Sequence, residues 1–534
     1  MSAVFRSLFP FEKKALAVAC ALVIGNAVQA QTLEERVEAL EQTQNQQSEI
    51  NQVVSDLVGK INVSGFVSIR GGQIDDEDVI YLSTMDDTWT FSEESVAGLQ
   101  VDSAVSEKLS VSMQLKASSA EEGVELEWGY LEYAFEPDLK LRAGRLRAPG
   151  FMLSEFLDVG YAYPWVQVPT EVYGWLPFSR YEGMDLRYWT SIGGVDFRFN
   201  PYAGTTTNQQ LAMGNLEFTD QSSEFAGLDV QMTYDIFTVR AGYSKYHFTL
   251  TDSVLDNFIG PVVEGVTIVP DIPPYIDGVS TLGLISFVED VMVGDGTANS
   301  GVLSDAILGV QNDGDPSNDF FVPVLQAEQA SLLAQLEPYR TIPSMNGAQD
   351  GEFYGVGFSA DNGEFLLMSE LSSSAIEGIY PDVESGYVMF GYRFGNWMPH
   401  ITFAKMYTTN DDERPEIQSF ELNELIWNSD PGLAQLAEGL NGYTEGLLVT
   451  MNIIRLEQET LTLGLRWDPV ESLAVKAEVF HVELQNGSYG FAIPSAMLAL
   501  SESNFLTFAD SEAPVYPEPA DSVNGVRMSL DLVF

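Results

Sequence analysis

Basic side chains recur on the polar face of segments in which polar and apolar residues alternate. Several have a carboxylate two residues away on the same face, as Arg187 has Asp185 and Lys476 has Glu478. Basic and acidic rows that face each other across a water-filled space would select small polar solutes by charge. The same charges could instead only pair with each other, so both interpretations stay open. The basic residues of these faces are Arg70, Lys116, Arg142, Arg187, Arg198, Arg240, Arg393, Arg466, Lys476 and Arg527.

Patterns typical of catalysis are weak in this chain. Its histidines, His247, His400 and His481, accompany no Gly-x-Ser-x-Gly or His-Glu-x-x-His sequence. The net charge of −53, from 78 acidic and 25 basic side chains, disfavours nucleic-acid binding, which needs a basic face. We therefore expect no enzyme, no nucleic-acid partner and no cofactor.

One acidic stretch has the spacing of a calcium loop but lacks its other residues. Asn318 stands where that loop needs glycine, and Val324 stands where it needs glutamate. We therefore predict no dedicated metal site, and only diffuse binding of divalent ions to acidic loops. The stretch consists of Asp313, Asp315, Ser317 and Asp319.

The alternating segments that carry the basic residues predict β-strands. A strand of about ten residues with one apolar face is the unit of a transmembrane barrel, which closes with an even number of strands in single bacterial chains. We predict an all-β fold, a transmembrane antiparallel barrel of about sixteen strands. The candidates are 61–71, 96–105, 109–119, 124–135, 139–147, 183–191, 194–201, 226–235, 236–249, 352–360, 364–374, 385–394, 398–407, 457–467, 473–483 and 523–534.

The connections between these candidates are in general alternately short and long. The short ones carry turn residues, as Glu136-Pro137-Asp138 and Asp361-Asn362-Gly363 do. Short periplasmic turns and long external loops are typical of outer-membrane barrels. Both ends of the barrel, which we assign to residues 61–534, are therefore expected on the periplasmic side. The long connections are 72–95, 148–182, 202–225, 250–351, 408–456 and 484–522.

The first sixty residues read as two segments outside the barrel. Residues 1–30 have a basic start, a short apolar core and small residues before Gln31, which predicts a secretory signal peptide. A membrane anchor, or a lipoprotein cut before Cys20, is the alternative. Residues 31–60 have apolar residues at heptad-like spacing, which predicts a periplasmic coiled coil. An ordinary amphipathic helix is the alternative there.

The C-terminus carries the most specific pattern. Val526, Met528, Leu530, Leu532 and Phe534 alternate with polar or small residues up to the last position. This matches the closing strand of bacterial outer-membrane barrels, whose terminal aromatic residue serves as the signal for the assembly machinery. A half-buried strand of a soluble sandwich is the alternative. We assign Phe534 as the assembly signal.

The connection 148–182 differs from the other long ones, because it is aromatic and rich in proline and holds few acids. A segment this apolar should be buried rather than exposed. Another long connection has leucines at helical spacing, which predicts a short helix over Phe320 to Arg340. Such a helix could cover the mouth of the barrel or pack on neighbouring loops.

The stretch from Leu141 to Tyr188 resembles a family of gammaproteobacterial outer-membrane porins. The resemblance rests on Gly144-Arg145 before a proline and on the run from Asp158 to Trp165, Asp-Val-Gly-Tyr-Ala-Tyr-Pro-Trp. It implies a trimer in which 148–182 folds inward as a constriction loop, with Arg142, Arg145 and Arg147 near it. By the same resemblance, the loop residues at the constriction are Glu155, Asp158, Tyr161, Tyr163, Trp165 and Glu171.

These patterns together predict an outer-membrane porin that lets small hydrophilic solutes diffuse passively through a partly basic lumen. The expected partners are outer-membrane lipid and lipopolysaccharide, the barrel-assembly machinery and two further copies in a homotrimer. The long insertion 250–351 leaves room for a substrate-specific channel, and the coiled coil resembles that of siderophore-type porins. A structural or adhesive barrel is the remaining alternative.

Overall fold

The structure is a computed structural model. It describes residues 61–82, 84–91, 95–119, 123–174, 180–206, 209–213, 216–251, 285, 287–294, 301–313, 317–341, 348–377, 380–410, 418–453, 455–495 and 518–534. The predicted signal peptide (1–30) and coiled coil (31–60) lie outside this described part.

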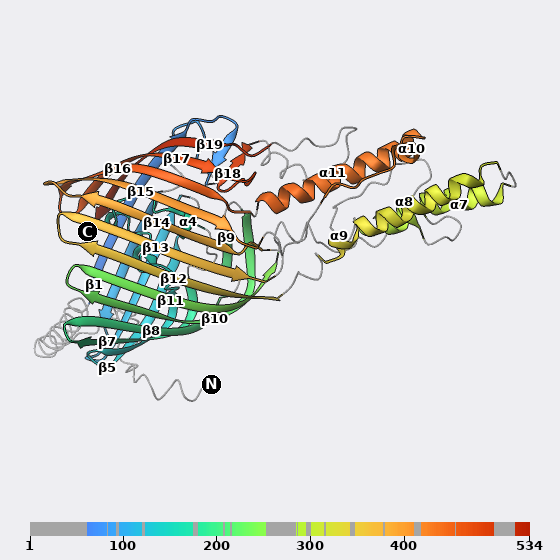
Figure 1. Cartoon of the computed structure of the whole chain (residues 1–534). Coiled ribbons are helices and arrows are strands. Elements are labelled where there is room, and N and C mark those ends of the chain that lie inside the picture. Colours follow the sequence, from blue (N-terminus) through green and yellow to red (C-terminus); the bar gives the residue numbers. More distant parts are fainter. Residues whose placement is uncertain are drawn as a thin grey trace, which may run out of the picture. The chain divides into compact units, whose positions relative to one another are not determined.

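Sixteen strands of the described residues form a closed antiparallel barrel (Figure 1). Each pairs with the next, and the last strand, β19, returns to pair with β1 from Phe66↔Val533 to Ile74↔Gly525. Closure satisfies the backbone hydrogen bonds of every strand within the sheet. The strands are β1 (Ile61–Ile74), β3 (Val96–Ala104), β4 (Leu109–Ser118), β5 (Glu125–Glu136), β6 (Leu139–Arg147), β7 (Arg180–Ile192), β8 (Val195–Thr206), β10 (Leu216–Tyr234), β11 (Phe237–Thr251), β12 (Ala348–Asp361), β13 (Phe365–Ile376), β14 (Val383–Tyr392), β15 (Trp397–Thr408), β16 (Gln458–Val470), β17 (Leu473–Leu484) and β19 (Ser522–Val533).

The predicted fold class and all sixteen candidate strands are confirmed. The largest difference is at β10, which begins at Leu216 rather than at 226. There the chain continues to pair beyond the alternating stretch, because β9 (Gln209–Met213) forms a hairpin with the start of β10. Alternation with one apolar face marks only the part of a strand that has an apolar surrounding, so it could not show this extension.

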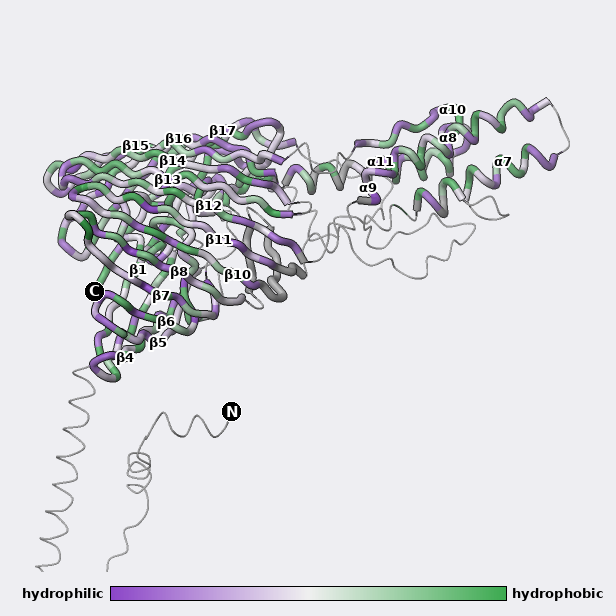
Figure 2. The backbone as a smooth tube through the Cα atoms, turned by 60° about the horizontal axis from the view of Figure 1, so that its bottom comes forward, coloured by the Kyte–Doolittle hydropathy of each residue, from purple (hydrophilic) through white to green (hydrophobic). Residues whose placement is uncertain are grey.

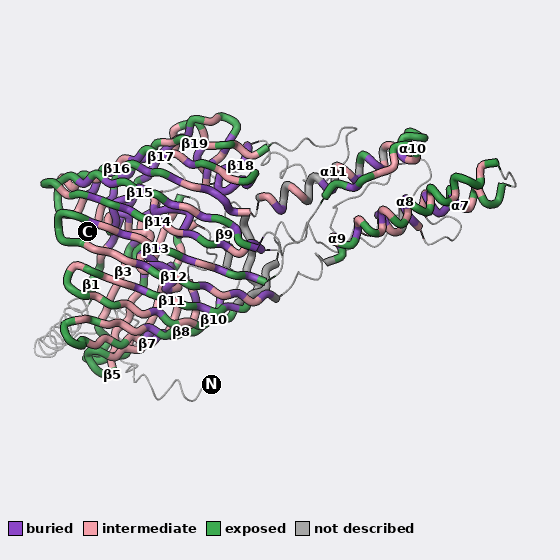
Figure 3. The backbone as a smooth tube through the Cα atoms, viewed as in Figure 1, coloured by how far each residue is buried: buried purple, intermediate pink, exposed green. Residues whose placement is uncertain are grey.

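Hydropathy (Figure 2) and burial (Figure 3) change from residue to residue along the strands of the barrel. Along β15, Trp397, Ile401 and Phe403 are exposed, whereas His400 and Thr402 between them are buried. The exposed face is the apolar one, as an outer face in lipid requires. Large aromatic residues beside the short turns are also exposed, namely Phe135, Tyr234, Phe394, Trp397, Trp467 and Phe534.

Two long connections form helices that pack on each other. The carboxylate of Glu328 accepts hydrogen bonds from Trp427 Nε1 at 2.7 Å and from the Asn423 backbone N–H at 3.0 Å. The predicted helix over 320–340 is confirmed as η4, α8 and α9. The helices are η3 (Phe287–Val293), α7 (Val302–Asn312), η4 (Asp319–Phe321), α8 (Val322–Gln335), α9 (Glu337–Thr341), α10 (Glu424–Trp427) and α11 (Pro431–Ile453).

Helix α11 was not predicted, because glycines at 432, 439, 442 and 446 lower helix propensity throughout its length. The helical spacing of Leu433, Leu436 and Leu440 is the signal that would have indicated it. No helix in the described ranges is long and apolar enough to cross a membrane.

Candidate functional site

The connection 148–182 is described over residues 148–174, which form three short helical turns and are largely buried, and its last three residues belong to β7. The helical turns are η1 (Ser154–Phe156), η2 (Gly160–Ala162) and α4 (Thr170–Tyr173). Trp165 and Val172 are almost completely buried, at 1% and 0% exposure. Burial explains the apolar composition of this connection, which we call the inner segment.

The inner segment lies against the inner face of the wall. Trp165 Nε1 donates a hydrogen bond of 2.8 Å to Thr402 Oγ1, and the Trp165 ring packs edge-on against Tyr387. Thr402 and Tyr387 alternate with the exposed Phe403 and Val388 on their strands. The inner segment is therefore inside the barrel, where Figure 1 places α4 among the strands.

Two basic side chains hold the backbone of the inner segment. Lys476 Nζ donates to the carbonyl oxygens of Gly160 at 2.6 Å and Trp165 at 2.8 Å, and it lies 2.9 Å from Asp531 Oδ2. Arg466 Nη1 donates to the carbonyls of Tyr161 and Tyr163 at 2.9 and 3.0 Å. Buried carbonyls need such donors because water cannot reach them.

Three carboxylates complete this attachment. Glu478 Oε1 accepts from the Val166 N–H at 2.8 Å, and Glu370 Oε2 accepts from the Met152 N–H at 2.8 Å. Glu171, within the inner segment, accepts from Gln458 Nε2 at 2.7 Å. Sequence reasoning missed Glu370, although it is the one acid on the inward positions of β13, and this was the available signal.

Charged side chains on β4 to β8, β10 and β11 form a second network. Arg142 Nε donates to Asp185 Oδ1 at 2.9 Å, and Arg142 Nη2 lies 3.6 Å from Glu155 Oε1. Glu155, on the inner segment, also pairs with Arg187. Glu155 therefore joins the inner segment to two neighbouring strands by ion pairs.

The rest of this network is also paired. Glu127 lies between Lys116 at 3.2 Å and Arg147 at 2.8 Å, and Arg147 also contacts Asp158. Asp229 pairs with Arg198 at 3.2 Å and with Arg240 at 2.5 Å. Unlike Lys476, several members keep contact with solvent: Glu155 is 38% and Arg198 25% exposed at the side chain.

Most basic residues singled out from the sequence thus contact either the inner segment or this network. Arg70 Nη2 donates to the Tyr163 hydroxyl at 2.8 Å. Arg240 Nη2 donates to the Pro149 carbonyl at 2.5 Å. Arg527 is buried over the ring of Phe480 and lies 3.7 Å from Glu478. The alternation placed these side chains on one face, and the structure adds which of them are covered.

Two of the predicted residues are in other places. Arg145 pairs with Glu182 at 2.7 Å, on the side of the wall where Leu131 and Met184 are exposed. Its separation of three residues from Arg142 puts it on the opposite face of a strand. Arg147, the last residue of β6, is buried and pairs with Glu127.

Arg393 is the second correction. It follows the last residue of β14 and binds both carboxylate oxygens of Asp361, at 2.6 and 2.9 Å, beside the short turn. It therefore stabilises a turn and does not join the inner network.

Two further connections approach the inner segment from outside the barrel strands. They form a small sheet of β2 (Val79–Tyr81) and β18 (Ala492–Pro494). Tyr81 stacks on Phe480, with ring centroids 5.6 Å apart, and burial raises the pKa of its hydroxyl to about 12. Tyr81 is therefore neutral at physiological pH and acts there as a packing and hydrogen-bonding group.

No protein-family model matches the chain, and no curated protein matches it. Several solved structures are similar to it in fold. OmpT, an outer membrane protein of Vibrio cholerae, is 11% identical with a TM-score of 0.41, over 89% of this chain and 97% of that one. An anion-selective porin from Comamonas acidovorans is 11% identical with a TM-score of 0.42, over 89% and 99%.

The outer membrane channel DcaP of Acinetobacter baumannii is 9% identical, with a TM-score of 0.41 over 89% of this chain and 97% of that one. The architecture itself rests on the strand pairing. The chain is a closed sixteen-stranded antiparallel β-barrel with one long connection folded inside it.

Proposed function

We propose that this protein is an outer-membrane channel of the porin type, through which small hydrophilic solutes diffuse passively. The apolar outer face, the alternately short and long connections and the predicted signal peptide support this location. A closed barrel of sixteen strands is wide enough for an aqueous channel.

One observation carries the proposal. Buried side chains attach the inner segment to β13 and β17, namely Glu370, Lys476 and Glu478, whereas Glu155 attaches it to β6 and β7 by partly exposed ion pairs. On β4, β7 and β8, the side chains of Lys116, Arg187 and Arg198 keep 14–25% of their surface exposed. The solute path in this proposal runs between the inner segment and the charged faces of β4 to β8, and 148–182 forms its constriction.

The charges on this path are expected to give weak rather than strong selectivity. Arg187, Arg198 and Lys116 each lie within 4 Å of a carboxylate. Paired charges largely cancel at the distance of a passing ion, particularly in salt. We therefore propose that the solute path is less basic than its arginines alone suggest. Its selectivity for the charge of a solute is small and depends on the exposed basic side chains.

Single-channel recording of the purified protein in a planar bilayer tests this function. We expect stable conductance steps and a small reversal potential in a salt gradient. Absence of conductance would contradict the channel and favour the structural or adhesive alternative. The helices of residues 285–341 and 418–453 would then be the contact surface, since Phe320, Phe321 and Leu425 are exposed on them.

The path can be located with introduced cysteines. Cys20 is the only cysteine and lies in the predicted signal peptide, so the mature background is expected to be cysteine-free. Ser112→Cys should react with a charged, membrane-impermeant thiosulfonate and reduce conductance, because Ser112 bonds to Asp102 at the polar face. Met113→Cys is the matched control on the exposed apolar face and should not respond. Equal responses of the two variants would place the path elsewhere.

Phe534 is proposed to act as the signal for the assembly machinery. The residue is 66% exposed, and its backbone closes the barrel with Gly65 through hydrogen bonds of 2.9 and 3.0 Å. Phe534→Ala keeps those backbone bonds and removes the ring. We expect severalfold less folded protein in the outer membrane, measured by heat-dependent gel migration, with unchanged stability of the fraction that folds. Wild-type yield would show that the ring is not a signal.

The homotrimer is a proposal that follows from the resemblance, and the contact with lipopolysaccharide is a proposal that follows from the proposed outer-membrane location. Mass measurement of the detergent-solubilised protein, with and without residues 31–60, tests the trimer and the role of the predicted coiled coil. A monomer both with and without residues 31–60 would exclude the trimer and a role of the predicted coiled coil in forming it.

A further inference from the structure

A groove of 650 Å³ opens on the outer face of the barrel, across β12 to β15. Val356, Leu371, Val388 and Phe403 line it, and all are exposed. They alternate with inward side chains such as Tyr387, so the groove is on the face opposite to the inner segment. Its volume is within the range of ligand sites in proteins, about 300–1,000 Å³.

Small residues at three neighbouring positions create this groove. Leu371 pairs with Gly386, Ser369 with Val388 and Ser373 with Glu384 across β13 and β14. A Cβ added at Gly386 would lie 2.5 Å from Leu371 Cδ2, so Leu371 leans over the glycine. Ser369, Ser373 and Gly386 leave the space that large side chains fill elsewhere on this face.

The polarity of the groove changes from one end to the other. Towards the short turns, its walls are the apolar Val388 and Phe403. Lys405 follows two residues later on β15, and Tyr407 with its hydrogen-bond partner Glu384 stands at the end next to the long connections. An amphiphile has the same order, an apolar chain below a charged headgroup.

At the polar end of the groove, the side-chain ammonium group of Lys405 can bind a phosphate. Lys405 Nζ lies 2.5 Å from Glu459 Oε1, and its side chain is 42% exposed. An ammonium group has three N–H donors, so Lys405 can bind a phosphate and keep Glu459. Tyr354 and Tyr407 beside it are typical of the membrane–water interface, where one end of the ring is apolar and the other is wet.

We propose that this groove binds one membrane lipid, with an acyl chain along Leu371, Val388 and Phe403 and a headgroup phosphate at Lys405. Lipid is already the surrounding of this face in the proposed location. A second copy of the chain would have to match both the apolar and the charged end with protruding side chains. A lipid matches both ends of the groove, because it has an apolar acyl chain and a charged headgroup.

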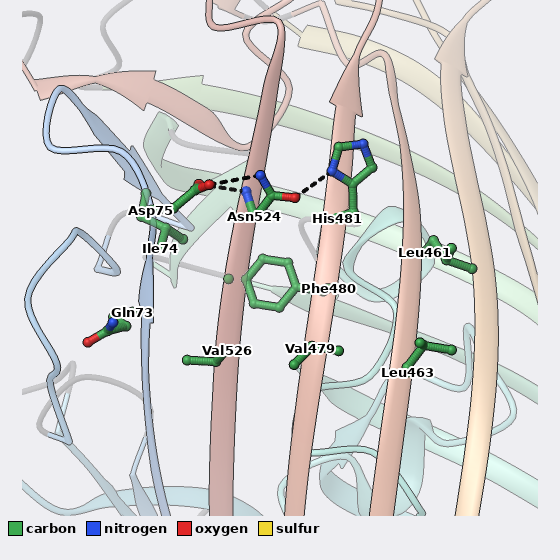
Figure 4. A pocket seen from close by; sticks show the side chains of 11 residues that line it. Gln73, Ile74, Asp75, Leu461, Leu463, Val479, Phe480, His481, Asn524 and Val526 are labelled. Carbon is green, nitrogen blue, oxygen red and sulfur yellow. Dashed lines mark hydrogen bonds between the residues drawn. The ribbon is translucent and has the colours of Figure 1, made fainter.

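A second groove on the outer face provides an internal comparison (Figure 4). It measures 410 Å³, and Leu461, Leu463, Val479 and Val526 are among its lining residues. At its polar end Asn524 donates to Asp75 at 2.8 Å, and His481 Nδ1 lies 2.7 Å from Asn524 Oδ1. The described residues that line it include no lysine or arginine, so it lacks the phosphate partner.

Native mass spectrometry of the delipidated full chain tests the proposal, with palmitoyl-oleoyl phosphatidylglycerol as the probe. Ser373→Trp fills the groove, and Lys405→Gln removes the cation but keeps a hydrogen-bond donor. We expect each to weaken binding of the first lipid by about tenfold. For Lys405→Gln this is the scale of one hydrogen bond to a charged group, and in Ser373→Trp the ring occupies the space of the acyl chain. Diacylglycerol, which has no phosphate, should respond to Ser373→Trp only.

The matched control is Ala226→Trp, which adds the same ring to an exposed position of β10 outside either groove. It should bind the probe as the wild type does. Equal weakening by Ala226→Trp, or wild-type binding by both groove variants, would overturn the proposal. So would a loss of oligomers in Ser373→Trp with the lipid retained, since that result would make the groove an interface between copies. Heat-dependent gel migration checks that each variant is folded.

Discussion

Glu155→Gln is expected to shift the reversal potential of the channel towards anion preference. Glu155 is the carboxylate of the inner segment that pairs with both Arg142 and Arg187. Its neutralisation leaves the positive charge of two arginines uncompensated by the inner segment. One unit charge about 5 Å from a passing ion changes its energy by about 1–3 kcal/mol between aqueous and interfacial dielectric. The permeability ratio of chloride to potassium should therefore rise about fivefold or more in dilute salt.

The measurement is a reversal potential in a tenfold gradient of potassium chloride, repeated at high ionic strength. Screening should reduce the shift there, because the Debye length falls from about 10 Å at 0.1 M to 3 Å at 1 M. Glu352→Gln is the control, since Glu352 contacts Tyr243 and Tyr354 on the outer face. A shift of equal size in the control, or none in Glu155→Gln, would place the ion path away from the inner segment.

Lys476→Met is expected to destabilise the protein by about 3–5 kcal/mol, the cost of breaking a buried ion pair by removing one partner. Lys476 is 1% exposed, and its loss leaves Asp531 and the carbonyls of Gly160 and Trp165 without their common donor. The free energy of unfolding in denaturant, followed by tryptophan fluorescence in detergent micelles, measures this effect. Single channels of the variant should also fluctuate between levels, because the inner segment has lost one of its attachments.

Two further variants serve as comparisons for the loss of stability in Lys476→Met. Arg393→Gln breaks an exposed pair with Asp361 at a turn and should cost no more than about 1 kcal/mol. Lys476→Met combined with Asp531→Leu removes both charges and should recover part of the lost stability, since no unpaired carboxylate stays buried. A double variant as unstable as the sum of the two single changes would mean that the two charges do not act as a pair.

The sequence was a good guide to the barrel because its signals are local. Alternation of two residues marks each strand of the barrel, and turns such as Asp361-Asn362-Gly363 separate the strands. The extension of β10 and helix α11 escaped this reasoning, since β10 pairs outside the apolar band and α11 is rich in glycine.

The roles of the inward basic residues could be predicted only in part. Alternation places Lys476 and Arg187 on the same kind of face, and it contains no information about which of them a distant segment covers. The structure separates them: Lys476 is buried under the inner segment at 1% exposure, whereas 14% of the Arg187 side chain is exposed. Arg142 and Arg145 are three residues apart, so the alternation of a strand puts them on opposite faces. The resemblance nevertheless implied that both lie near the constriction loop.

The attachment of the inner segment also bears on the order of assembly. The segment lies early in the chain, yet its partners Glu370, Glu478 and Lys476 belong to late strands; the contacts of Lys476 with Gly160 and Trp165 span 316 and 311 residues. Contacts this distant in sequence form late, because a long loop must close first. An unfinished barrel without β17 consequently lacks the Lys476 donor for those carbonyls, and we expect the inner segment to reach its final position only as the last strands close the wall.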